Sequence, residues 1–538
     1  MKAFLMHRDR DFELDRPLPP DEGELTRDLE LEKLFHAMAL GDRFLVDVAR
    51  RAVLSSLQNP EEILYRQQVL KDCVEQASIV RELYAIAVEA IEGERKIYHS
   101  FLQYPQAILH RSIDVMDLFV VQLKKLRSVA DEHADKFQSE GFVAFFKMLD
   151  RELDDEYFRT IEDHLQQLRF RHGVLVSARL GKGNKGVDYV LRTLRIAKRG
   201  WRQWISFGDR SAYTVTIADR DEGGMRALSE LMDRGLNLAA NALAQSADHI
   251  LSFFTMLRTE LGFYIGCLNL QRRLVEKGEP LCFPTPLAPG RPVLATSGLY
   301  DVCLSLSMEE RVVGNDVNAD DKLLVMITGA NQGGKSTFLR SIGLAQLMMQ
   351  CGMFVAAEAF RANVCDAIFT HYKRREDAAM NSGKFDEELG RMSEIANRVT
   401  PNSMLLFNES FSATNEREGS EIASSIVRAL LETGIKVFFV THSFELAHGF
   451  YARGMDTALF LRAERKADGR RTYKVVEGEP WPTSHGEDLY RRIFGEVPDI
   501  ELVATRSFLR PEGGGCRLSP GPESLLAGSR RDHLPPNE

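Results

Sequence analysis

The segment LLVMITGANQGGKST, residues 323–337, decides the fold. Its apolar half is typical of a strand buried on both faces of a parallel sheet. Its second half matches G-x-x-x-x-G-K-[ST], and FLRSIGLAQLMMQ (338–350) continues it as an amphipathic helix. A strand, a glycine-rich loop and a helix in this order form a cradle of backbone N–H groups for nucleotide phosphates. We therefore predict an α/β domain of the P-loop type that binds ATP.

The residue types in this loop predict how each would contact the nucleotide. Lys335 would reach the β- and γ-phosphates, and the Ser336 hydroxyl would ligate Mg²⁺, so ATP and Mg²⁺ are the expected cofactors. The expected nucleotide contacts in the loop are Gly329, Ala330, Asn331, Gln332, Gly333, Gly334, Lys335, Ser336 and Thr337. GKGNKG (181–186) spells a second glycine pattern, but it lies between two strand-like runs, so we interpret it as a hairpin turn.

Two further apolar strands end in polar residues. SMLLFNES (403–410) places Asn408 and Glu409 at the end of one strand, and KVFFVTHSFEL (436–446) places His442 at the end of another. Glu409 is the candidate general base for the attacking water. Asn408 occupies the position beside Mg²⁺ where an Asp is usual, so Mg²⁺ retention should be weak. His442 is expected to sense the γ-phosphate or orient the water. The alternatives are a solvated carboxylate for Glu409 and a structural histidine.

The remaining composition bounds the class of protein. The chain has 538 residues, a net charge of −9 and seven scattered cysteines without a CxxC pair. A zinc site or disulfide framework is therefore not expected, and a reducing cytoplasm fits the thiols. We find no run of eighteen apolar residues and no signal peptide, which predicts a cytoplasmic, nucleoid-associated protein without a membrane partner.

The pattern of prolines and apolar residues divides the chain. We predict a poorly ordered lead-in over 1–28, a helical domain over 29–300, the ATPase domain over 301–505 and a disordered tail over 506–538. No proline occurs between Pro105 and Pro280. Residues 224–278 could therefore form one helical rod of about 80 Å, or else two or three packed helices.

A basic segment interrupts the helical domain at about 170–220. Residues 169–210 hold eleven Lys or Arg against two acids, a net of +9, and include Trp201 and Trp204. Concentrated positive charge suits salt-sensitive contacts with nucleic-acid phosphates. The candidate DNA contacts are Arg179, Lys182, Lys185, Arg192, Arg195, Lys198, Arg199 and Arg202. The alternative is a solvated surface paired with acidic helices such as 150–163.

These motifs together resemble the MutS family of DNA mismatch-repair ATPases. GANQGGKST (329–337) is similar to that family's GPNMGGKST loop, NESFSATNEREG (408–419) to its DELGRGTSTxDG segment, and THSFEL (441–446) to its THYxEL motif. NSGKFDEEL (381–389) resembles the signature segment SGRSTFMxEM but is shorter. The helices over 29–300, including YRQQVLKDC (65–73), resemble the family's core and lever, and the basic insertion would be its clamp.

The resemblance implies a dimer with composite ATP sites, because in that family, as in ABC-type ATPases, the signature loop completes the partner subunit's site. Ser382 would then contact the γ-phosphate in trans. The chain resembles a short homologue without the N-terminal mismatch-recognition domain. The function implied is an ATP-gated clamp on duplex, mismatched or branched DNA in repair or recombination. Two alternatives remain open: a nucleotide-gated scaffold with little hydrolysis, and a clamp on RNA or the ribosome.

Overall fold

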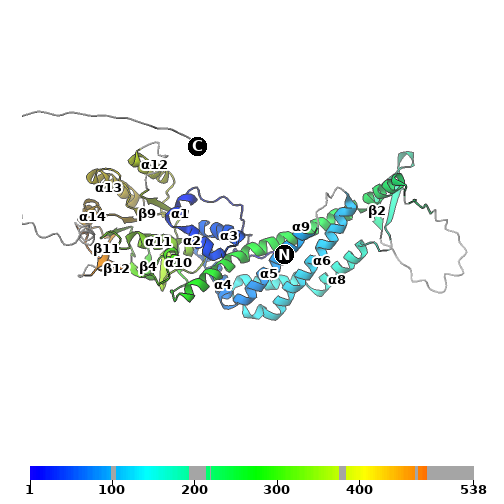
Figure 1. The fold of residues 1–538 in the computed structure, drawn as a ribbon, viewed down its shortest axis with the longest axis horizontal. Coiled ribbons are helices and arrows are strands. Elements are labelled where there is room, and N and C mark those ends of the chain that lie inside the picture. Colours follow the sequence, from blue (N-terminus) through cyan, green and yellow to red (C-terminus); the bar gives the residue numbers. More distant parts are fainter. Residues whose placement is uncertain are drawn as a thin grey trace, which may run out of the picture. The chain divides into compact units, whose positions relative to one another are not determined.

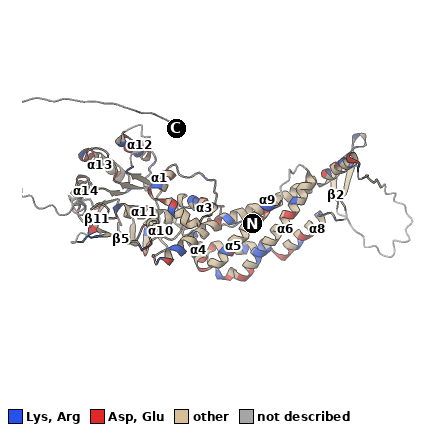
Figure 2. Cartoon of the chain, in the orientation of Figure 1, with Lys and Arg blue, Asp and Glu red and all other residues tan. Residues whose placement is uncertain are grey.

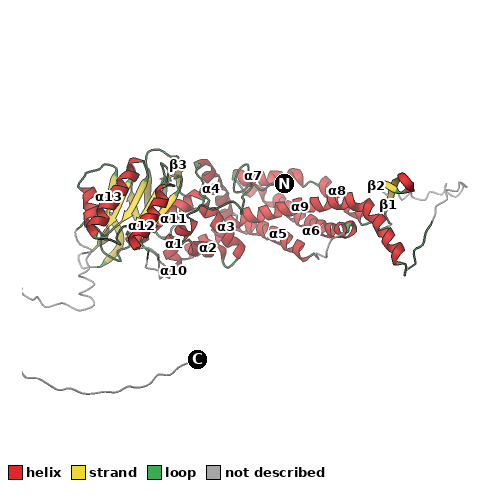
Figure 3. Ribbon diagram, turned by 90° about the horizontal axis from the view of Figure 1, so that it is seen from above, coloured by secondary structure: helices red, strands yellow, loops and turns green. Residues whose placement is uncertain are grey.

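The computed structural model describes residues 1–97, 104–171, 173–192, 214–218, 220–374, 383–466 and 470–481. Helices dominate up to Glu276, and strands alternate with helices from Thr285 onward (Figures 1 and 3). The change to strands thus precedes the predicted boundary at residue 300, because β3 (Thr285–Leu287) and β4 (Leu294–Leu299) pair with β7 (Ala359–Asn363) of the α/β part. The predicted tail, 506–538, lies outside the described residues. No helix in the described ranges is long and apolar enough to cross a membrane.

Residues 1–28 are not the poorly ordered lead-in that their prolines predicted. The segment contains α1 (Glu22–Asp28) and buries five apolar side chains: Ala3, Leu5, Met6, Phe12 and Leu25. The Glu260 carboxylate accepts hydrogen bonds from the backbone N–H groups of Leu5 at 2.6 Å and of Phe12 at 3.3 Å. A carboxylate far away in the chain thus satisfies these backbone groups, and no local sequence pattern indicates such a partner.

Within the described residues, the helical part has eight α-helices before the hairpin. They are α1, α2 (Leu31–Ala39), α3 (Arg43–Leu54), α4 (Pro60–Glu75), α5 (Ala77–Lys96), α6 (Pro105–His133), α7 (Glu140–Glu152) and α8 (Asp155–Leu168), with η1 (Ala134–Lys136) after α6. Local chemistry sets the starts: the Asn59 side chain accepts from Glu61 N at 2.9 Å, and Pro60 occupies the first turn. Asp154 caps α8 through Tyr157 N at 2.7 Å.

Helix α9 (Glu222–Glu276) is one continuous helix of 55 residues, about 82 Å at 1.5 Å per residue. The alternative of several packed helices is therefore wrong. The Asp221 side chain caps it by accepting from Gly224 N at 2.9 Å. Its central part packs on α5 and α6, where the Phe119 and Phe254 rings lie 5.6 Å apart. Figure 1 shows α9 running from beside the α/β part to the hairpin.

The hairpin consists of β1 (Leu175–Leu180) and β2 (Gly186–Arg192), antiparallel, with η2 (Lys182–Asn184) at its turn. GKGNKG is therefore a hairpin turn, as interpreted. Gly235 of α9 lets the hairpin approach, because a Cβ there would lie 2.6 Å from a Val176 methyl group. Most of the basic segment beyond β2, residues 193–213, lies outside the described residues.

The α/β part is built on a six-stranded, mainly parallel sheet in the order β12-β11-β6-β10-β9-β8. Only β12 runs antiparallel to its neighbour. The strands are β6 (Leu324–Thr328), β8 (Ile368–Tyr372), β9 (Met404–Asn408), β10 (Lys436–Val440), β11 (Ala458–Arg465) and β12 (Arg471–Glu477). A second sheet, in the order β3-β7-β4-β5, contains β3 (Thr285–Leu287), β4 (Leu294–Leu299), β5 (Asn315–Asn318) and β7 (Ala359–Asn363).

Helices cover both faces of the six-stranded sheet, as the continuous apolar strands require. Alternate residues of β6 separate the faces: Met326 packs in one cluster with α12, α13 and α14, and Ile327 packs in another with α11. The helices are α10 (Val302–Ser307), α11 (Lys335–Gln350), α12 (Lys384–Ala396), α13 (Glu416–Glu432) and α14 (Phe444–Tyr451). The fold is thus α/β behind a helical part.

Candidate nucleotide site

The glycine-rich loop lies between β6 and α11, in the order that the sequence predicted. Gly334 has a φ of +91°, in the left-handed region that favours glycine. A Cβ on Gly333 would lie 2.8 Å from the Ala463 methyl group and 2.9 Å from the Ala330 carbonyl oxygen. Both glycines are therefore required for the loop to turn tightly beside β11 and leave α11 with its N-terminal N–H groups free for an anion.

Lys335 lies at the start of α11 and is buried, with 4% exposure. Its ammonium group donates to the carbonyl oxygens of Gly329 at 2.9 Å and Ala330 at 3.1 Å. Burial lowers the pKa of Lys335, while the negative charge of Glu409 opposes that shift. The ammonium makes no ion pair with a carboxylate of the described residues. It is thus a buried cation held by neutral carbonyl groups, which an anionic ligand would compensate.

Ser336 and Asn408 meet across the loop. The Ser336 hydroxyl donates to the Asn408 side-chain oxygen at 2.8 Å, which joins the first turn of α11 to the end of β9. Two neutral oxygen atoms at this spacing fit a hard cation such as Mg²⁺, which prefers oxygen ligands. Neither side chain of this pair is a carboxylate, although an aspartate is usual at the position of Asn408.

Glu409 and His442 converge at the same edge of the sheet. They follow the neighbouring parallel strands β9 and β10, and His442 Nδ1 lies 3.3 Å from Glu409 Oε1. The backbone N–H of Glu409 donates to the Val440 carbonyl at 2.9 Å. Glu409 has a φ of +56°, a strained conformation for a residue with a Cβ. The chain therefore leaves the strand at Glu409, the position where a catalytic carboxylate is expected.

A cavity of about 530 Å³ lies against the loop. Its polar side includes Lys335, Ser336 and Glu409, and its other side is formed by residues that the sequence did not single out. These residues are Met308, Arg311, Val312, Val313, Asn315 and Tyr473. The volume is typical of a small-molecule site. Tyr473 comes from β12, so only the folded sheet brings it to the loop. His442 contacts Glu409 but does not line this cavity.

His371 is a second feature that the sequence did not reveal. It is fully buried at β8, with Nδ1 2.8 Å from Ser410 Oγ and Nε2 3.0 Å from the Glu388 carbonyl oxygen. Its ring stacks on Phe411 at a centroid distance of 5.2 Å. Burial, reinforced by the charge of Arg391, lowers its pKa to about 4, so the ring is neutral. His371 therefore braces the turn that carries Glu409, and it also contacts α12.

The structure describes only some of the other residues that the sequence predicted to contact nucleotide or DNA. Ser382 lies outside the described residues, as do Arg195, Lys198, Arg199 and Arg202. Arg179, Lys182, Lys185 and Arg192 are exposed on the β1–β2 hairpin. Arg179 lies 3.8 Å from Asp188 of the same hairpin, and Arg192 donates to Ser177 at 2.9 Å. Among the described contacts, none of these four cations forms an ion pair with a carboxylate of α7 or α8, the two helices that contain most of residues 150–163. Figure 2 shows the charges of the described hairpin and of α9.

Comparison with known families separates the two parts of the chain. The family model for the MutS2 N-terminal domain matches residues 58–277, and that for MutS domain V matches residues 325–490. The chain belongs to the MutS family. The resemblance inferred from the motifs is therefore confirmed, and the helical region of this MutS-family chain is similar to the N-terminal domain of MutS2.

Curated relatives match parts of the chain. The DNA mismatch repair protein MutS of Thermotoga sp. strain RQ2 is 36% identical over 172 residues, 31% of this chain and 22% of that protein. Endonuclease MutS2 of Lacticaseibacillus casei is 33% identical over 204 residues, which are 37% of this chain and 25% of that protein. Endonuclease MutS2 of Thermus thermophilus is 32% identical over 203 residues, which are 38% of this chain and 27% of that protein. The match thus spans about a quarter of each relative's length.

Proposed function

We propose that this chain is an ATPase that binds DNA in the manner of the MutS family, as a dimeric, ATP-gated clamp acting in repair or recombination. The observation that carries the proposal is the meeting of three features at one sheet edge. They are the buried Lys335 ammonium, the Ser336–Asn408 pair and the Glu409–His442 pair. A cavity of about 530 Å³ beside them provides room for the nucleotide.

The chemistry follows from the positions of these groups. Lys335 and the loop N–H groups bind the phosphates, and Ser336 with Asn408 would hold Mg²⁺, which neutralises charge on the phosphate oxygens. Glu409 accepts a proton from water as the water oxygen bonds to the γ-phosphorus and the bond to the β–γ bridging oxygen breaks. His442, 3.3 Å from Glu409, holds that carboxylate toward the water. His371 acts through the backbone turn as a positioning residue.

Described contacts support coupling of this site to the long helix. α11 begins at Lys335, and the carbonyl oxygen of Cys351, just past its end, accepts from Arg66 at 3.2 Å. Arg66 also donates to the Met6 carbonyl at 2.8 Å. Met6 and its neighbour Leu5 donate to Glu260 of α9. The N-terminal segment therefore joins the helix of the phosphate loop to the helix that contacts the hairpin.

The exposed cations of the hairpin supply the proposed DNA contacts. Contacts to phosphates are independent of sequence and weaken steeply with salt. The dimer completes each ATP site with Ser382 of the other subunit's signature loop in this proposal. Retention on matched, mismatched and four-way-junction DNA, measured with and without ATP, tests the coupling. We expect ATP to change retention in the wild type and to leave it unchanged in Lys335→Ala. Equal retention with and without nucleotide in the wild type contradicts the gating.

A nucleotide-gated scaffold is the second candidate, and Asn408 favours it because the site lacks a carboxylate next to Mg²⁺. Steady-state turnover separates the two. Hydrolysis by the wild type that is lost in Glu409→Ala supports the ATPase and contradicts the scaffold. A basic clamp does not identify its polymer, so competition between duplex DNA, branched DNA and structured RNA decides between DNA and an RNA or ribosome target.

A further inference from the structure

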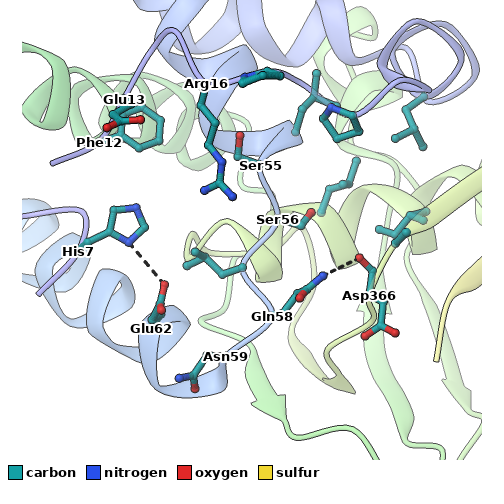
Figure 4. Close-up of a pocket in the computed structure, with 18 of the residues that line it drawn as sticks. His7, Phe12, Glu13, Arg16, Ser55, Ser56, Gln58, Asn59, Glu62 and Asp366 are labelled. Atoms are coloured by element: carbon teal, nitrogen blue, oxygen red, sulfur yellow. Dashed lines mark hydrogen bonds and ion pairs between the residues drawn. The ribbon is translucent and has the colours of Figure 1, made fainter. Parts of the chain in front are cut away.

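A second cavity lies away from the candidate nucleotide site. It has a volume of about 860 Å³, within the range of small-molecule sites. Five parts of the chain line it: the N-terminal segment, the connection from α3 to α4 with the first half of α4, the C-terminal half of α11, the residues around β8, and Arg398 after α12 (Figure 4). Neither the proposed nucleotide chemistry nor the proposed DNA contacts use it.

One wall contains a buried guanidinium without a carboxylate partner. Arg66 has 1% exposure and donates to the carbonyl oxygens of Met6 and Cys351 and to His7 Nε2. It forms no ion pair with any carboxylate of the described residues. Arginine stays protonated in proteins, so the charge is buried among neutral acceptors. Such a charge is costly unless an anion lies near it.

His7 places an unused donor at the same wall. Arg66 can only donate, so Nε2 of His7 is the acceptor of their 2.8 Å contact and the neutral ring carries its hydrogen on Nδ1. Burial, with the positive charges of Arg66, Arg10 and Arg16, lowers the pKa of His7 to about 3, which keeps the ring neutral. Nδ1 is buried without a hydrogen-bond partner, and its nearest carboxylate, Glu62 at 3.5 Å, accepts from Arg10 at 2.7 Å.

More donors line the space in front of His7. Arg16 extends into the cavity and makes no ion pair within the described ranges (Figure 4). The Ser55 and Ser56 side chains lie along the connection from α3 to α4 on the same side. Most of the carboxylates are already engaged: Glu62 with Arg10, Asp21 with Arg398, and Asp11 with Lys2. Two unpaired guanidinium groups and an N–H therefore face a region that also contains two acids without an ion pair among the described residues, Glu13 and Asp366. Asp366 accepts hydrogen bonds from the Thr400 hydroxyl at 2.9 Å and from the Asn402 amide at 3.2 Å.

Apolar side chains form the rest of the wall. Phe12, Leu25, Leu57, Leu347 and Phe369 line the cavity. Phe12 and Leu25 come from the N-terminal segment, and the other three come from the connection from α3 to α4, from α11 and from β8. We propose that this cavity binds a small organic anion, with an oxyanion head group at Arg16, His7 and Ser55 and an apolar or aromatic body against these side chains. Charge-assisted hydrogen bonds to Arg would fix the head group, and burial of the body would supply affinity.

Phenyl phosphate is the probe, titrated calorimetrically into the full chain with ATP present to occupy the nucleotide site. We expect one phenyl phosphate per chain and weaker binding of inorganic phosphate, which lacks the apolar body. Arg16→Gln and Ser55→Asp should each weaken binding about tenfold or more, equivalent to about 1.4 kcal/mol. Arg8→Gln is the matched control, because Arg8 lies on the same segment but pairs with Glu140 outside the cavity. Arg8→Gln should bind as the wild type does.

Three results would overturn the proposal. They are no heat from phenyl phosphate at millimolar concentration, equal affinity for inorganic phosphate, and unchanged affinity in Arg16→Gln. Arg16 is exposed, so its substitution should leave the fold intact, which circular dichroism checks. If Ser55→Asp alone fails to fold, the Arg16→Gln comparison still decides the outcome.

Discussion

Glu260 makes the attachment of the N-terminal segment to α9 sensitive to pH. Its carboxylate is fully buried and accepts from the backbone N–H groups of Leu5, Met6 and Phe12. Burial raises the pKa of Glu260 from 4.5 to about 7, although the three hydrogen bonds act in the opposite direction. Between pH 4.5 and about 7, Glu260 is protonated while the N-terminal segment is packed on α9, and it loses this proton when the segment opens. Protonated Glu260 therefore stabilises the closed segment below pH 4.5, and this stability is lost as pH rises through 7.

The size of the effect follows from that difference in pKa. Raising the pH from 5.5 to 8 should cost the closed segment about 2 kcal/mol, since one pKa unit corresponds to about 1.36 kcal/mol. Hydrogen exchange of a peptide covering residues 1–15, corrected for intrinsic rates, measures this local opening. Its protection should fall about 30-fold over this range in the wild type.

Glu260→Gln removes the titration and keeps the side chain's shape, so its protection should be nearly independent of pH. Glu140→Gln is the control, because Glu140 pairs with Arg8 of the same segment but is exposed. It should follow the wild type. A wild-type segment whose protection is the same at both pH values, or a Glu260→Gln variant with the wild-type trend, would refute the reasoning.

Three further predictions address the site and the hairpin. Asn408→Asp places a carboxylate 2.8 Å from the Ser336 hydroxyl and should tighten Mg²⁺ binding about 10- to 100-fold, seen as a lower Mg²⁺ requirement for turnover; an unchanged requirement contradicts the assignment. Gly235→Ala puts a methyl group 2.6 Å from Val176 and should loosen the hairpin by about 1–3 kcal/mol, measured by its hydrogen exchange. Lys182→Gln with Lys185→Gln should reduce the salt slope of DNA binding by about 2, whereas an unaltered slope removes these lysines from the interface.

The sequence predicted the strand, the glycine-rich loop and the helix of the candidate nucleotide site because that information is local. A buried strand, a glycine loop and a helix follow one another within residues 323–350, so one motif specifies all three. Glu409 and His442 were found because each ends an apolar strand of the same sheet. Parallel strands bring their carboxyl ends to one edge, and this places the two side chains 3.3 Å apart.

The sequence did not predict features that depend on contacts between residues far apart in the chain. The N-terminal segment reads as a loop because of its prolines, yet residues of α4 and α9 satisfy its backbone groups. His371 and Tyr473 reach the site from β8 and β12, and neither strand carries a motif that marks them. Such residues become visible only when the strand order is known. The long helix α9 was predictable because its pattern continues without proline over its whole length.

Binding of a triphosphate at the Lys335 loop is the claim on which the rest depends. Calorimetric titration of the full chain with a slowly hydrolysed ATP analogue and Mg²⁺ tests it most directly, with Lys335→Ala as the comparison. We expect saturable heat with one nucleotide per chain in the wild type and its loss in Lys335→Ala. No heat in the wild type, or undiminished heat in Lys335→Ala, would contradict it.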